Sequence, residues 1–232
     1  MFPLRWDTLL PGLLAEKSSN EAARRAAALA GQCANRLLRE AQRKPPTLRI
    51  EACQDWQKLS DLFLRHRPHD RITRDRSAEF LQWRYGQNTD AHPSGVYVVS
   101  DQRGHEGWFA IGHSVRGRHR QLRGFVLLDA FWPREHMSFG EIFQSLVWLT
   151  QNEGNADAVW FRPRFDVDLK ECSRWMFSIR REAPSTYVIT QKGDSPLDVN
   201  LLDLTPADGD SALPLSPMLL GNEVMNDCTV VP

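Results

Sequence analysis

The 232-residue sequence predicts a mixed α/β fold with a mostly antiparallel central sheet, helices on both of its faces and an N-terminal helical arm. Strand-like segments follow one another closely through residues 96–130 with glycines between them, which is typical of an antiparallel meander. Capped amphipathic helices precede and follow this meander. An apolar fraction of 41% in a chain of this length is enough to bury a sizeable core.

The first 46 residues are expected to lie outside this sheet as a separate arm and helix. Residues 1–17 contain prolines and predict an irregular arm. A helix is expected over 20–43, because Ser18 and Glu21 are spaced to form a capping box at its start. Its apolar positions form a narrow face of small residues at helical spacing: Ala26, Ala30, Cys33, Leu37 and Ala41.

Short strands and amphipathic helices are expected to build the main domain, over 47–213. Asp55 is a good helix cap, and Ser138 with Glu141 can form a second capping box. In order, we expect a strand over 48–52, helices after Asp55 and over 77–85, strands over 96–100, 108–113 and 122–130, a helix over 138–152, a strand over 156–162, a helix over 166–176, strands over 185–190 and 198–204, and a tail over 214–232.

Charge restricts the classes of partner. Lys plus Arg and Asp plus Glu both number 29, so the chain has no general attraction to nucleic acid or to an anionic membrane. Basic runs over 65–76 and 116–123 are either solvated surface or contacts for phosphate or an anionic sugar. Neither run has the interleaved aromatic side chains that stack on bases, so we do not expect a nucleic-acid partner.

The sequence also favours a cytoplasmic protein with no membrane span. No segment approaches the roughly 18 uninterrupted apolar residues of a spanning helix, and residues 1–14 lack the pattern of a signal peptide. The four cysteines are scattered, which fits a reduced compartment better than a disulfide framework. His66 and His69 are the closest histidine pair, and without a third ligand they predict no metal site.

Two short strings carry a resemblance to a known superfamily. The string FLQWRYG (Phe80–Gly86) resembles a Leu-x-Trp-Arg-Tyr motif of GNAT-like proteins encoded with bacterial polysaccharide-synthesis genes. The string LTPADGDSAL (Leu204–Leu213) resembles the segment that closes those domains. The expected order of elements is also that of the GNAT fold, and the resemblance covers residues 47–213.

The resemblance implies a transferase that moves an acyl group from acetyl-CoA or another acyl-CoA to an amine, such as an amino sugar or another small amine. It implies a catalytic carboxylate at Asp129 and backbone N–H groups near Phe131 that polarise the thioester carbonyl. Asp129 has a plainer interpretation as a strand-end residue in a turn.

The loop after the strand over 122–130 would hold the CoA pyrophosphate in such an enzyme. The resemblance implies phosphate contacts from Arg134 and His136 and backbone donors at Ser138 and Gly140, where the plainer interpretation is a polar loop before a helix cap. It also implies that Cys172 is the general acid, at the position where many family members have a Tyr, although the plainer interpretation of a buried Cys is a small hydrophobic side chain.

Two departures from the family pattern leave a second hypothesis open. The loop WPREHMSFG (Trp132–Gly140) has one glycine and a different spacing from the family's pyrophosphate loop, and a thiol replaces the phenol at Cys172. The alternative is therefore a GNAT-fold module without CoA binding that acts as an interaction or scaffold subunit. For residues 1–43, we expect either a homodimer contact or docking on the chain's own sheet.

Overall fold

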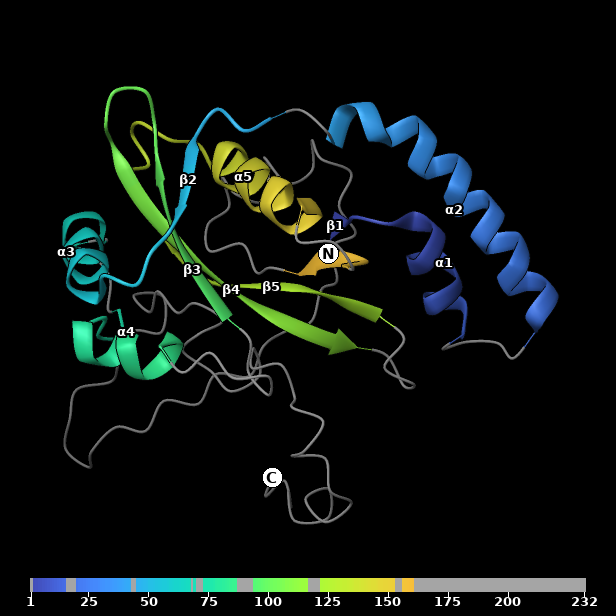
Figure 1. Ribbon diagram of the computed structural model, residues 1–232, viewed down its shortest axis with the longest axis horizontal. Coiled ribbons are helices and arrows are strands. Elements are labelled where there is room, and N and C mark those ends of the chain that lie inside the picture. The colour runs from blue at the N-terminus through green and yellow to red at the C-terminus, as the bar shows by residue number, and fades with distance from the viewer. Residues whose placement is uncertain are drawn as a thin grey trace, which may run out of the picture.

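The computed structural model describes residues 2–15, 20–42, 45–67, 69, 73–86, 94–116, 122–152 and 156–160. Its centre is a six-stranded sheet in the order β1-β6-β5-β4-β3-β2 (Figure 1). The strands are β1 (Phe2–Pro3), β2 (Arg49–Ala52), β3 (Ser94–Ser100), β4 (Glu106–Arg116), β5 (Leu122–Phe131) and β6 (Ala158–Trp160). The predicted strands that precede Trp160 are therefore confirmed, with boundaries that differ by a few residues.

The sheet is mostly antiparallel, as the meander predicted. Strands β2, β3, β4 and β5 pair antiparallel in chain order, and β1 pairs antiparallel with β6. The pair β5–β6 is parallel, so the chain must cross from one end of the sheet to the other between them. The helix α5 (Phe139–Asn152) makes this crossing.

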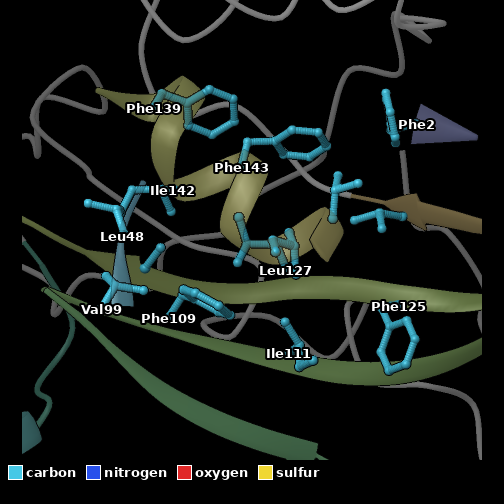
Figure 2. Close-up of a cluster of buried hydrophobic side chains, with 14 of the residues drawn as sticks. Phe2, Leu48, Val99, Phe109, Ile111, Phe125, Leu127, Phe139, Ile142 and Phe143 are labelled. Atoms are coloured by element: carbon cyan, nitrogen blue, oxygen red, sulfur yellow. The ribbon is translucent and has the colours of Figure 1, made fainter. Parts of the chain in front are cut away.

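Helix α5 covers one face of the sheet, where it builds the larger core (Figure 2). Phe139, Ile142 and Phe143 of the helix belong to this core together with Phe109 and Leu127 of β4 and β5. The ring of Phe143 packs edge-on against Phe2, with ring centres 5.3 Å apart (Figure 2). The apolar stripe that the sequence predicted for residues 138–152 packs against this face of the sheet.

Helices α3 (Trp56–His66) and α4 (Ala78–Tyr85) cover the opposite face. The carboxylate of Asp55 accepts a hydrogen bond from the Lys58 N–H, which confirms the predicted cap of α3. The string FLQWRYG lies in α4 and its C-cap, where Leu81 and Tyr85 are buried and Trp83 is exposed. Helices therefore lie on both faces, as predicted.

The prediction of an irregular segment over 1–17 is wrong. Residues 2–3 form the edge strand β1, and Trp6–Ala15 form the helix α1. The backbone N–H groups of Leu4 and Arg5 both donate to the carbonyl of Asp157, so the arm docks on β6 of its own chain. An edge strand of two residues is invisible to sequence patterns, because its pairing partner lies far along the chain.

Helix α2 (Glu21–Gln42) confirms the predicted helix over 20–43, but it packs on α1 through a different face (Figure 1). Gly31 lies so close to the Trp6 carbonyl that a Cβ would sit 2.3 Å from its oxygen. Asn35 donates to the carboxylate of Asp7 over 2.7 Å. In the predicted face Ala26, Ala30 and Cys33 are exposed, while the side chains of Leu37 and Ala41 lie outside the described residues.

Several expectations fall outside the described residues: Ser18, Cys172, the helix over 166–176, the strands over 185–190 and 198–204, the string Leu204–Leu213 and the tail over 214–232.

Candidate functional site

A β-bulge near the end of β5 decides where its last side chains point. Ile111 pairs with Leu127 and Ala110 pairs with Asp129, so Leu128 is the extra residue. The bulge reverses the alternation of faces from that point on. As a result the side chain of Asp129 lies on the α4 face.

Asp129 forms a buried ion pair there. Arg76 Nε donates to Asp129 Oδ2 over 2.6 Å, and the Tyr85 hydroxyl donates to the same oxygen over 3.3 Å. The exposed fraction of the side chain is 1% for Arg76 and 0% for Asp129. The Arg76 guanidinium also lies over the rings of Phe80 and Phe131. Asp129 is thus held within a layer of aromatic side chains.

The loop between β5 and α5 contains most of the residues that the resemblance singled out. The N–H groups of His136 and Met137 both donate to the Pro133 carbonyl, which forms a tight turn. The indole N–H of Trp132 donates to the Met137 carbonyl over 3.0 Å and closes this turn from inside. Arg134 stacks on the outer side, with its guanidinium 4.3 Å from the centre of the Trp132 ring. Arg134 and His136 are exposed.

The start of α5 is closed by the predicted capping box. Ser138 Oγ accepts from the Glu141 N–H over 3.2 Å, and Glu141 Oε2 accepts from the Ser138 N–H over 2.9 Å. A carboxylate therefore already lies at the helix N-terminus, the position that attracts anions. Gly140 lies in the first turn and is partly buried.

The turn between β3 and β4 lies beside this loop and carries an Asp–His pair that the sequence analysis missed. His105 Nδ1 lies 2.8 Å from Asp101 Oδ2. The other carboxylate oxygen of Asp101 accepts from the N–H groups of Arg103 and His105. The hydrogen bond from His105 lowers the pKa of Asp101 below its ordinary value. Residues 101–105 (DQRGH) carry a turn pattern whose Asp and Gly could have indicated this arrangement.

The imidazole of His105 stacks on that of His136. Their ring centres are 3.7 Å apart and their planes differ by 11°. This contact joins the β3–β4 turn to the β5–α5 loop, across 31 positions of the sequence. The structure thus brings Asp101, His105 and His136 together.

The predicted site residues on β5, Asp129 and Phe131, lie apart from the predicted residues of the β5–α5 loop. Phe131 is buried against Phe63 of α3, with ring centres 4.8 Å apart. Asp129 lies on the same face as Phe131, whereas Trp132 packs into the core beneath α5. Cys172 is not among the described residues.

Within the described part of the chain, no group of three His, Cys, Asp or Glu side chains is placed to hold a metal ion. None of the helices that the structure describes is both long and apolar enough to cross a membrane. No protein-family model matches the sequence, and no curated protein matches it either.

Proposed function

We propose that the protein is a GNAT-like N-acyltransferase that moves an acyl group from acetyl-CoA or another acyl-CoA to an amino sugar or other small amine in the cytoplasm. The strand order supports this proposal. The resemblance implies a mixed, mostly antiparallel sheet with helices on both faces, and the antiparallel meander from β2 to β5 followed by α5 and β6 is consistent with that arrangement.

One observation carries the proposal: the β5–α5 loop lies at the carboxyl end of a strand that pairs in parallel with its neighbour. In doubly wound α/β sheets, ligands bind outside the carboxyl ends of the parallel strands, and the resemblance implies the same place for CoA in this mostly antiparallel sheet. Here Arg134 and His136 are exposed on the loop, and the N-terminus of α5 follows at once. A phosphate would meet a guanidinium, an imidazole and a helix N-terminus in one place.

The reaction would be a direct attack of the amine nitrogen on the thioester carbonyl. Backbone N–H groups near Phe131 would polarise that carbonyl, as in an oxyanion hole. Proton acceptance by Asp129 would require a water path to a carboxylate that has no exposed surface and lies against Arg76.

Calorimetry with acetyl-CoA, comparing the unmodified protein with Glu141→Gln, tests the proposal. The amide keeps a hydrogen-bond acceptor for the Ser138 N–H and removes one negative charge from the helix N-terminus. We expect about fivefold tighter binding for Glu141→Gln, since one unit charge a few ångströms from a phosphate is worth about 1 kcal/mol at high dielectric. The exposed Glu79 on α4 is the control, and Glu79→Gln should leave the affinity unchanged. An absence of heat with both acetyl-CoA and longer acyl-CoAs would remove the proposal.

The position of the Glu141 carboxylate favours the second hypothesis, a GNAT-fold interaction module without CoA binding. Glu141 satisfies the Ser138 N–H from within the chain, so the helix start needs no external anion. If Glu141→Gln binds no better than the unmodified protein and neither shows any heat, the interaction module is the better description.

A homodimer through residues 1–43 is part of the proposal. Ala26, Ala30 and Cys33 on α2 are exposed, and Leu29 between them is 64% exposed. Packing on α1 uses another side of the helix, which leaves this apolar strip available to a second copy of the chain.

A further inference from the structure

Two titratable rings join the β3–β4 turn to the β5–α5 loop. The ring centres of His105 and His136 lie 3.7 Å apart, and the ring planes differ by 11°. The His105 side chain is 31% exposed, and His136 is exposed. Protons from water can therefore reach both rings while the rings lie face to face.

Asp101 balances the charge of one of these rings. Its Oδ2 lies 2.8 Å from His105 Nδ1, and its Oδ1 accepts from the N–H groups of Arg103 and His105. The hydrogen bond from His105 lowers the pKa of Asp101, so its carboxylate is ionised throughout the range in which histidines change charge. A proton on His105 therefore meets a negative charge in the same turn.

His136 has no counterpart of Asp101 among the described residues. The other charged or titratable side chains of the turn, the loop and the adjoining part of α3 are Lys58, His66, Arg103, Glu106, Arg134 and Glu135. The Glu106 carboxylate accepts from Lys58 over 2.8 Å, and its carbonyl lies 2.8 Å from His66 Nε2. Arg103 and Arg134 add positive charge, and Glu135 is exposed to water. A proton on His136 is thus left without a bonded carboxylate.

The stack accommodates one positive charge better than two. While one ring is neutral, the single imidazolium is balanced by Asp101. When both rings are protonated, two positive charges face each other and one carboxylate cannot balance both. Two like charges about 4 Å apart in water repel strongly enough to change an equilibrium about fivefold, and more where water is partly excluded.

We propose that the His105–His136 stack is a pH-controlled latch between the β3–β4 turn and the β5–α5 loop. The latch is closed while at most one ring is protonated, and it opens when both are. Histidines change charge between about pH 5 and 8, so the latch is closed at about pH 7.5 and opens toward about pH 5. It needs no bound ligand and is therefore independent of the proposed function.

Opening would release the outer part of the β5–α5 loop and leave its inner part in place. The indole N–H of Trp132 donates to the Met137 carbonyl, and neither residue belongs to the stack. Gly107 lies so close to Trp132 that a Cβ would sit 2.6 Å from the Trp132 Cβ. The sheet and the inner turn of the loop therefore stay together when the two histidine rings separate.

NMR of the full-length protein with labelled histidine rings tests the latch. At about pH 7.5 we expect nuclear Overhauser effects between the ring protons of His105 and His136. Between about pH 6.5, the ordinary pKa of histidine, and about pH 5, these should weaken at least about fivefold. The indole N–H signal of Trp132 should stay in place, which would show that the loop remains folded. A stack that persists down to about pH 5 would overturn the latch.

His136→Phe is the matched variant, because it keeps a ring in the stack and removes the second charge. Its ring contact with His105 should be present at both pH values. Asp101→Asn removes the charge that favours protonated His105, so the opening should move to lower pH. His66→Gln changes a histidine outside the stack and should leave the opening as it is. A contact that His136→Phe also loses at about pH 5 would assign the opening to other groups and refute the latch.

Discussion

The burial of Arg76 and Asp129 has a large energetic consequence. Each is a charged side chain with almost no exposed surface, and each is compensated by the other. Breaking such a pair leaves an uncompensated buried charge, which typically costs about 3–5 kcal/mol. The pair therefore holds α4 and the preceding loop against the bulged end of β5.

For Arg76→Met we expect the free energy of unfolding to fall by about 3–5 kcal/mol, measured by urea denaturation. The double variant Arg76→Met/Asp129→Leu should recover much of that loss, because both charges are then absent. Tyr85→Phe is the control for the weaker 3.3 Å hydrogen bond and should cost only about 1 kcal/mol. Equal losses in the single and double variants would show that packing, rather than charge, accounts for the effect.

His66 makes stability depend on pH. Burial lowers its pKa below the ordinary value, although the hydrogen bond to the Glu106 carbonyl opposes this shift. Below a pH of about 6.5 the unfolded state binds more protons at this site than the folded state. The free energy of unfolding should therefore fall as the pH falls from about 6.5 through the lowered pKa of the folded state.

Denaturation at a series of pH values between about 7.5 and 5 measures this dependence. His66→Gln should flatten the stability curve in that window. A slope that His66→Gln does not change would assign the pH dependence to other groups.

The parallel pair β5–β6 depends on a glycine. A Cβ on Gly124 would lie 2.0 Å from the Ala158 carbonyl oxygen and 2.3 Å from the Trp160 ring, both of which belong to β6. Gly112 on the neighbouring strand is in a milder position, since its Cβ would meet Leu128 Cδ1 at 3.0 Å. The backbone of Ala158 cannot move aside as easily as the side chain of Leu128, which can change its rotamer.

Gly124→Ala should therefore lower the thermal midpoint by more than Gly112→Ala does. Overpacking of this kind costs about 1–3 kcal/mol, and a displaced strand costs more. Hydrogen exchange should show the additional loss of protection in β6 and β1, which depends on β6 for its pairing. A similar small effect of both substitutions would indicate that β6 shifts without cost.

In the whole molecule, the N-terminal segment that contains β1 and α1 packs against the central sheet. Strand β1 covers the edge of β6, and Leu9 of α1 packs on Leu122 and Ala158. Removing this segment would expose an apolar face and a strand edge together.

A chain that begins at Leu48 should therefore unfold at a lower temperature and aggregate more readily, as measured by thermal scanning and light scattering. The full-length protein should run as a dimer. Leu29→Glu should dissociate that dimer without a loss of stability, while Leu64→Glu, at an exposed leucine of α3, should leave it intact. A monomeric full-length protein would remove the dimer and leave the segment's structural role unchanged.

The sequence by itself determined the elements between Arg49 and Trp160, with their order and their caps. Asp55, Ser77 and the Ser138–Glu141 pair act within a few residues of their own positions, and so do the amphipathic stripes of α3 and α5. Local patterns suffice there, because helix capping and side-chain periodicity depend on the neighbouring backbone alone.

Only the tertiary structure decided which side chains meet. β1 pairs with a strand more than 150 positions away, the bulge at Leu128 turns Asp129 toward Arg76, and His105 stacks on a histidine from another loop. None of these contacts leaves a periodic trace in the sequence. They depend on strand register and on loop positions, which are set when the whole sheet packs against its helices.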